Sequence, residues 1–144
     1  MSASASAPLL AAAYLSTTYR IDTPSGPIAL RVGQRSDALD RLLKRRRLRA
    51  WAFVTACNPR SRRLPGWRNL ARQRRLQALS GRLGFAALPG AGVGDDPAWR
   101  PEPSLLLMGI GRARARRLAR LLGQNAIVAG RRGRAPELVW CSKR

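Results

Sequence analysis

The sequence predicts a single α/β domain with a mixed sheet of about five strands, covered by three to four helices. Three observations support this fold class. The chain has 144 residues, a usual size for one domain with a buried core. Hydrophobic residues make up 45% of it, as in globular proteins. Strand-like and helix-like apolar patterns alternate along the chain. We expect residues 1–8 to be a flexible tail and residues 9–144 to form the domain.

The first elements follow from short apolar patterns. A short helix is predicted for residues 9–18, and a strand for residues 27–32, where buried and exposed side chains should alternate. Ser36 is the predicted N-cap of the next helix, since leucines recur on one face after it. Residues 50–56 (AWAFVTA) form an apolar run typical of a strand buried on both faces. We expect this central strand to be parallel to its neighbours.

The second half of the chain continues the alternation. Residues 67–83 form a predicted helix with leucines at core spacing, and Gly84 ends it. Residues 90–101 are a predicted loop because Gly, Asp and Pro are frequent there. The remaining predicted elements are strands at 85–88, 104–108, 124–129 and 137–141 and a helix at 111–122.

The charge is strongly positive and unevenly distributed. There are 28 basic residues, of which 26 are Arg, and seven acidic residues, for a formal net charge of +21. Residues 41–94 contain 14 of the basic residues and no acid. Because an anionic partner would relieve this self-repulsion, the composition predicts non-specific binding of nucleic acid or another polyanion. The predicted contact residues are Arg45, Arg46, Arg47, Arg68, Arg72, Arg75, Arg112, Arg116 and Arg120.

Three of these arginines recur every fourth residue in the predicted helix at 111–122, so we expect an exposed stripe whose removal leaves the fold intact. Two alternatives explain the basic residues without a partner. An excess of Arg, Ala, Gly, Leu and Pro is also what a GC-rich coding sequence produces. The basic run at 44–47 follows a predicted helix, whose C-terminal end it would stabilise.

The composition excludes several classes of function. There is no histidine, which excludes Ser-His-Asp and Cys-His triads and His-based metal sites. Cys57 and Cys141 have no CxxC spacing and are too few to crosslink a secreted domain, and residues 1–15 lack the early basic charge of a signal peptide. No apolar run approaches the roughly 20 residues of a membrane span. We therefore expect a cytoplasmic protein with no membrane segment, metal or cofactor.

Polar residues gather at the predicted ends of the buried strands. Asn69 joins them because it lies seven residues before Leu76 and shares its helical face. We expect Asn58, Asn69 and Glu102 to approach one another. These side chains either satisfy backbone groups at strand ends, or form an amide-lined pocket for a small polar ligand or enzyme substrate, with Glu102 as the carboxylate for proton transfer. The candidate pocket residues are Thr55, Asn58, Arg60, Ser61, Asn69, Glu102, Ser104, Gln124 and Asn125.

Three shorter motifs have both a functional and a structural interpretation. Nearby arginines could activate Cys57, but a thiol without a base is more often a small buried hydrophobe. Asp95 and Asp96 could bind a cation, but adjacent carboxylates in a Gly/Pro-rich segment usually form turns. The segment LMGIGR (107–112) leads from a strand into a helix whose first turn could bind phosphate, or its glycines could serve the turn alone.

Four blocks of the sequence resemble one known family. They are YLSTTY (14–19), VTACNPRS (54–61), WRPEPSL (99–105) and GQNAIV (123–128). Their order and spacing resemble the bacterial domain-of-unknown-function 3293 family over nearly the whole chain. The resemblance implies no activity, cofactor or partner. The family usually has an aromatic residue where Cys57 stands, which argues against a nucleophilic role for this thiol.

Overall fold

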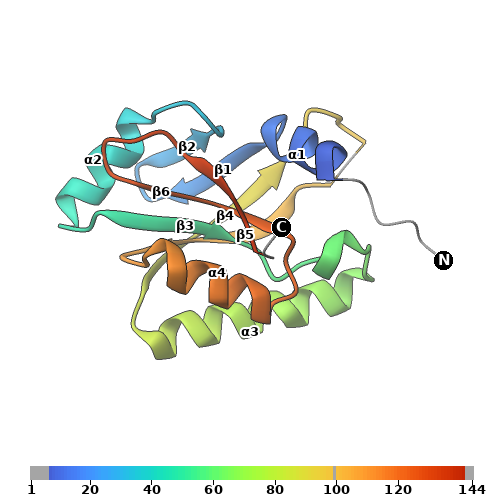
Figure 1. Ribbon diagram of the computed structural model, residues 1–144. Helices are drawn as coiled ribbons and strands as arrows, with labels where there is room; N and C mark the ends of the chain where they lie inside the picture. The colour runs from blue at the N-terminus through green and yellow to red at the C-terminus, as the bar shows by residue number, and fades with distance from the viewer. Residues whose placement is uncertain (1–6, 99, 142–144) are drawn as a thin grey trace.

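A seven-stranded antiparallel sheet organises the chain in the computed structural model, which describes residues 7–98 and 100–141 (Figure 1). The strand order across the sheet is β2-β1-β4-β5-β3-β6-β7. Residues 1–6 of the predicted tail lie outside the described residues, and Ala7 and Pro8 begin the first helix. The strands are β1 (Thr18–Thr23), β2 (Gly26–Leu30), β3 (Ala50–Val54), β4 (Ala86–Val93), β5 (Glu102–Met108), β6 (Ala126–Arg131) and β7 (Glu137–Trp140).

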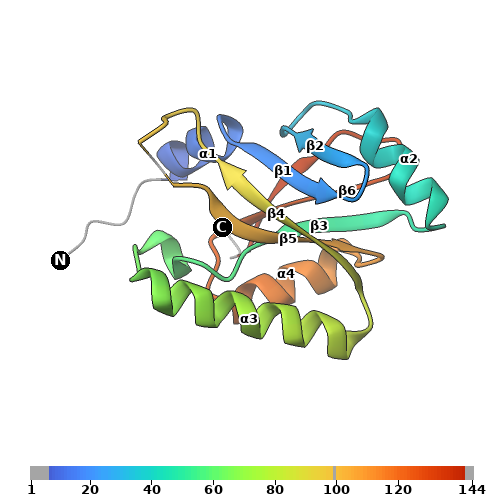
Figure 2. The ribbon, with the colours of Figure 1, turned by 180° about the vertical axis from the view of Figure 1, so that it is seen from behind.

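Helices cover both faces of the sheet (Figures 1 and 2). α1 (Ala7–Leu15) and α2 (Asp37–Arg45) lie against one face, and α3 (Gly66–Leu83) and α4 (Arg112–Leu121) lie against the other. A short 3₁₀ turn, η1 (Pro59–Ser61), connects β3 to α3. Among the described helices, none is long and apolar enough to cross a membrane.

The central strand β3 separates two apolar cores because its side chains alternate between the faces. Ala52 and Val54 belong to the core that includes Leu76 of α3. Trp51 and Phe53 belong to the core that includes the buried leucines of α2. Burial on both faces therefore explains the continuous apolar run of this strand.

Local signals mark the start of α2 and the end of α3, as the sequence predicted. The Ser36 side chain caps α2 and accepts a hydrogen bond from the backbone N of Leu39 at 3.2 Å. Gly84 ends α3 with a φ of 79°, a left-handed conformation that favours glycine. Both predicted helix boundaries are thus confirmed.

The direction of the central strand and the number of strands differ from the prediction. β3 is antiparallel to both β5 and β6, not parallel. The apolar run could not distinguish the two, because helices on both faces bury a strand of either direction. The sheet has seven strands rather than about five.

The difference in strand number has a local cause. β1 lies between the helix predicted for residues 9–18 and the strand predicted for residues 27–32, where no strand was expected. It forms there because its exposed Arg20 and Asp22 alternate with buried Tyr19 and Ile21. β4 extends well into the segment predicted to be a loop: residues 90–93 pair with β1, and residues 90–92 also pair with β5. The small glycine and alanine side chains of this stretch therefore allow close strand packing and not only turns.

Gly130 of β6 offers a test of the β3–β6 register, in which it pairs with Trp51. A Cβ at this position would lie 2.7 Å from Cζ2 of the Trp51 indole, which is fully buried. Gly130→Ala should therefore lower the free energy of unfolding by about 1–3 kcal/mol, the usual cost of overpacking. Urea unfolding measures this loss. Gly94→Ala is the matched control, since its Cβ would meet nothing within 4 Å; equal losses in the two variants would contradict the register.

Candidate functional site

The candidate pocket residues converge at one end of the sheet. Because β3 is antiparallel to its neighbours, its C-terminal end lies beside the N-terminal ends of β5 and β6. The loop after β3, the start of β5 and the segment before β6 therefore meet there, together with the first turns of α3 (Figure 1). Six of the nine candidates lie in the first two segments: Thr55, Asn58, Arg60, Ser61, Glu102 and Ser104.

The loop after β3 has a strained backbone. Asn58, Arg60 and Ser61 have φ values of 46°, 54° and 59°, in the left-handed region. For residues other than glycine such conformations cost on the order of 1–3 kcal/mol each, and they persist only where surrounding contacts impose them. Residues 57–62, hereafter the 57–62 loop, must therefore be held by contacts with the rest of the fold.

One set of these contacts comes from the side chains of Asn58, Asn69 and Glu102. We call these three side chains the amide brace. The Asn58 Nδ2 donates to Glu102 Oε2 at 3.0 Å, and the Asn69 Nδ2 donates to Asn58 Oδ1 at 2.8 Å. The Asn58 backbone N donates to Asn69 Oδ1 at 2.9 Å. The backbone N of Leu64 also donates to Asn58 Oδ1, at 2.9 Å. The prediction that these three residues approach one another is confirmed.

The side chains of five further pocket candidates also form hydrogen bonds within the protein. Gln124 Nε2 donates to Cys57 O at 3.0 Å, and Asn125 Nδ2 donates to Ser61 Oγ at 2.9 Å. The Thr55 hydroxyl donates to Pro103 O at 2.7 Å, and the buried Ser104 hydroxyl donates to Glu102 O at 3.0 Å. Three of these four bonds end on backbone carbonyls, which matches the interpretation in which polar side chains satisfy backbone groups at strand ends.

The C-terminal end of α4 supports the 57–62 loop from the other side. The backbone N of Arg60 donates to Gly123 O at 2.6 Å. Gly123 has a φ of 72°, and a Cβ there would lie 2.9 Å from the Cβ of Pro59. Glycine is therefore required both by the backbone conformation and by the close approach of the loop.

Burial changes the acidity of several groups around the amide brace. Desolvation raises the pKa of Glu102 above its usual range, although hydrogen bonds from the side chains of Asn58 and Thr55 oppose the shift. Burial, with Glu102 nearby, raises the pKa of Tyr14 to about 12. Desolvation also raises the pKa of Cys57, and it raises the pKa of Cys141 to about 11. Both thiols therefore stay protonated at neutral pH, which opposes a nucleophilic role for Cys57.

An open hollow lies between the 57–62 loop and the C-terminal end of α4. Its volume is about 350 Å³, and none of its lining residues is acidic. A second hollow of about 260 Å³ adjoins it and shares Arg60, Arg120 and Gly123 with it. We call the first the arginine hollow; it is lined by Pro59, Arg60, Arg62, Leu64, Arg72, Arg120, Leu121, Leu122 and Gly123.

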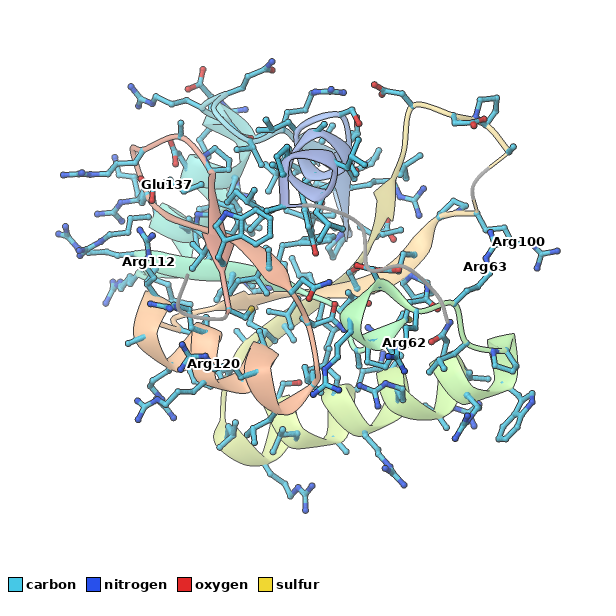
Figure 3. All side chains as sticks on the ribbon, turned by 45° about the vertical axis from the view of Figure 1, so that its right-hand side comes forward. Arg62, Arg63, Arg100, Arg112, Arg120 and Glu137 are labelled. Atoms are coloured by element: carbon cyan, nitrogen blue, oxygen red, sulfur yellow. The ribbon has the colours of Figure 1, made fainter. Side chains whose placement is uncertain are left out.

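The four arginines of the hollow differ in their contacts. The Arg72 guanidinium donates to Ala56 O at 2.6 Å and to Leu122 O at 2.5 Å, and thus neutralises carbonyls at the C-terminal end of α4. Arg120 donates to Cys141 O. Within residues 7–98 and 100–141, neither Arg60 nor Arg62 forms an ion pair. Figure 3 shows Arg62 in the loop that leads into α3 and Arg120 on α4.

The structure does not bring the nine arginines predicted to bind a polyanion onto one surface. Arg45, at the end of α2, and the following Arg46 and Arg47 belong to the helix layer on the opposite face of the sheet from Arg68 and Arg75 of α3. Arg72, another of the nine, is engaged within the protein. It lies one turn before Leu76, so it points inward toward the ends of β3 and α4.

The predicted exposed stripe on α4 is likewise engaged within the protein. Arg112 pairs with Glu137 at 2.8 Å, and Arg120 bonds to the backbone of Cys141. Arg116 is half-buried, and its buried Nε has no hydrogen-bond partner among the described residues. Arg112 and Arg120 thus tie α4 to β7 and to the residue after it, so the stripe has internal contacts. That replacing all three arginines leaves the fold intact stays a prediction.

Of the two remaining motifs, the Asp95–Asp96 pair has structural contacts. Asp95 pairs with Arg31 at 3.6 Å, and Asp96 accepts a hydrogen bond from the backbone N of Ala98 at 2.9 Å, as a turn former does. No group of three or more potential metal ligands occurs in the described part of the chain. Gly111 is the residue before α4, and neither hollow includes it.

Sequence reasoning missed four residues that shape this end of the molecule: Arg62, Trp67, Gln73 and Leu121. Gln73 is buried and accepts a hydrogen bond from the Ala56 backbone N at 3.2 Å. A signal existed for Trp67. It lies nine residues before Leu76, about two and a half helical turns, and therefore on the opposite side of α3.

The sequence matches the model of a family described as "Protein of unknown function (DUF3293)" over residues 54–127, about half of the chain. The match includes every residue of the arginine hollow and of the amide brace. Of the four blocks that suggested this family, the one at 14–19 lies outside the matched range. No curated protein and no solved structure matches the chain.

The amide brace can be tested by removing one of its side chains. Asn69→Ala leaves the Asn58 backbone N without its acceptor and Asn58 Oδ1 without one donor. We expect the free energy of unfolding to fall by about 1–3 kcal/mol, the cost of leaving a buried polar group unsatisfied. Asn125→Ala, which removes one exposed bond to Ser61, should change it by less than about 0.5 kcal/mol. Similar effects in denaturant unfolding would mean that the brace does not hold the loop.

The raised pKa of Glu102 predicts how stability depends on pH. The folded protein keeps this proton to a higher pH than the unfolded chain, so ionisation lowers stability as the pH rises through the folded-state pKa. Glu102→Gln removes this loss. Its melting temperature relative to the unmodified protein should increase as the pH rises above about 4. Glu137→Gln, which removes an exposed carboxylate paired with Arg112, should show no such gain; a flat difference for Glu102→Gln would contradict the shift.

Proposed function

The chain belongs to the DUF3293 family of proteins of unknown function, and we propose that it binds nucleic acid through phosphate contacts in the arginine hollow. The observation that carries the proposal is a concave surface lined by four arginines and no acid. Arginine binds phosphate well because its planar guanidinium donates two parallel hydrogen bonds to one phosphate group.

Two of the arginines are available for this contact. Arg60 and Arg62 form no ion pair within the described residues, whereas Arg72 and Arg120 bond to backbone carbonyls. Arg72 has a supporting effect, because it bonds to the Leu122 carbonyl oxygen at the end of α4, which would otherwise repel an anion. We therefore assign the direct phosphate contacts to Arg60 and Arg62.

The shape of the site favours a chain over a small molecule. Sites for small ligands enclose most of the ligand surface, but this hollow is open to solvent and continues into a second one through Arg60 and Arg120. A phosphodiester backbone can pass along such a surface. The formal net charge of +21 also favours the approach of an anionic chain to the protein surface.

The 57–62 loop supports the proposal by its rigidity. The strained backbone at Asn58 and Arg60 and the bonds of the amide brace fix where the loop presents its arginines. A binding surface that is already ordered loses less entropy when a ligand binds. The alternative, a small polar-ligand site or enzyme built on the amide brace, has less support because Asn58 and Asn69 already bond to each other and to the loop backbone.

The proposal predicts that removing two arginines weakens nucleic-acid binding only when those arginines line the hollow. We expect the double variant Arg60→Gln/Arg62→Gln to weaken duplex DNA binding and to lower the slope of log K against log salt by up to about 1.8, since each phosphate contact contributes about 0.9. Fluorescence anisotropy over a salt series measures both quantities.

The matched control is Arg45→Gln/Arg46→Gln, which removes the same charge from the opposite helix layer. It should leave the slope nearly unchanged. If both double variants lower the slope equally, binding follows net charge and the hollow has no particular role. If pyrophosphate binds with the same dependence on Arg60 and Arg62 while DNA does not bind at low salt, the ligand is a small phosphate compound instead.

A further inference from the structure

We infer that the nucleic acid bound at the arginine hollow is single-stranded, and that Trp67 stacks against one of its bases. The inference rests on the proposed function and adds to it the kind of nucleic acid and a residue that senses it. Trp67 is not part of either apolar core.

Trp67 is a large aromatic residue exposed on a helix. It lies in the first turn of α3 and is 73% exposed, on the side of the helix opposite the buried Leu76. The guanidinium carbon of Arg68 lies 5.8 Å from its ring centroid, so the indole already contacts a cation at the surface. Single exposed hydrophobic residues are common in proteins. Exposure alone therefore does not mark Trp67 as a binding residue, and its position relative to the arginine hollow must be considered.

That position is next to the cationic surface. Trp67 lies three residues after Leu64, which precedes α3 and lines the arginine hollow, while Trp67 itself lines neither hollow. Leu121, on the opposite wall of the hollow, is 83% exposed, and Leu70 of α3 is 53% exposed. Apolar and cationic surface thus adjoin at this end of the sheet, and Figure 3 shows Arg62 and Arg63 in the loop that leads into α3.

This combination matches the chemistry of single strands. Proteins that bind them use a positively charged groove for the backbone and aromatic side chains on which bases stack. In a duplex the base faces are covered by neighbouring pairs, so an exposed indole gains nothing from them. A single strand running along the two adjoining hollows, with its phosphates at Arg60 and Arg62, can place an unpaired base on Trp67.

An acidic peptide is the competing occupant. Its carboxylates would also pair with Arg60 and Arg62, but it offers no flat aromatic face for Trp67. The effect of removing the indole, compared between single strand, duplex and polyglutamate, therefore distinguishes these partners.

The test uses the full chain and a fluorescent oligo(dT) of about twelve nucleotides, within the usual site size of one binding domain. Its duplex with oligo(dA) and a labelled polyglutamate are titrated in parallel at low salt. We expect the single strand to bind more tightly than the duplex. Trp67→Ala should weaken single-strand binding by about 5- to 150-fold and duplex binding by less than about twofold. Trp67→Phe should retain most of the single-strand affinity.

Leu83→Ala is the matched control, because it removes an exposed apolar side chain from the far end of the same helix. It should leave single-strand binding unchanged, and thermal unfolding should show that Trp67→Ala retains the fold. The inference is overturned if Trp67→Ala binds the single strand as the unmodified protein does, or if it loses single-strand and duplex binding equally. In either case dependence on Arg60 and Arg62 would still support the proposed function. Binding of polyglutamate alone would overturn both.

Discussion

The antiparallel pairing of β3 with both of its neighbours determines where the candidate site lies. Because β3 runs opposite to β5 and β6, its C-terminal end meets their N-terminal ends. Polar residues distant in sequence, such as Asn58 and Glu102, are thereby brought within hydrogen-bond distance. In a parallel arrangement the start of β5 would lie at the opposite end of the sheet. The amide brace, the 57–62 loop and the arginine hollow all depend on this pairing.

The hydrogen bonds around the 57–62 loop offset the strain in its backbone. Left-handed conformations at Asn58, Arg60 and Ser61 are unfavourable for the isolated chain. They persist because the amide brace holds one side of the loop and Gly123 accepts a hydrogen bond on the other. Each net hydrogen bond contributes only about 1 kcal/mol, so several are needed to offset the strain. This explains why so many polar groups are engaged in such a short segment.

The convergence of the amide-brace residues could be predicted from the sequence, but the arginine hollow could not. Asn69 could be predicted to face inward because helical periodicity places it with Leu76, and Asn58 and Glu102 flank recognisable apolar runs. The direction of the central strand could not be predicted, because an apolar run has no direction. The hollow could not be predicted either. It depends on contacts such as Arg72 with Leu122 O, between segments that only the completed fold brings together.

The net charge of this protein is a poor guide to the number of charges that can contact one partner. Helix layers on opposite faces of the sheet divide the arginines between two surfaces. Several also have internal partners: Arg72 and Arg120 bond to backbone carbonyls, and Arg112 pairs with Glu137. An arginine bonded in this way must give up that contact, or share it, to bind a phosphate. A ligand at the hollow would therefore neutralise few charges at once, and its affinity would depend on the positions of Arg60 and Arg62 far more than on the total of +21.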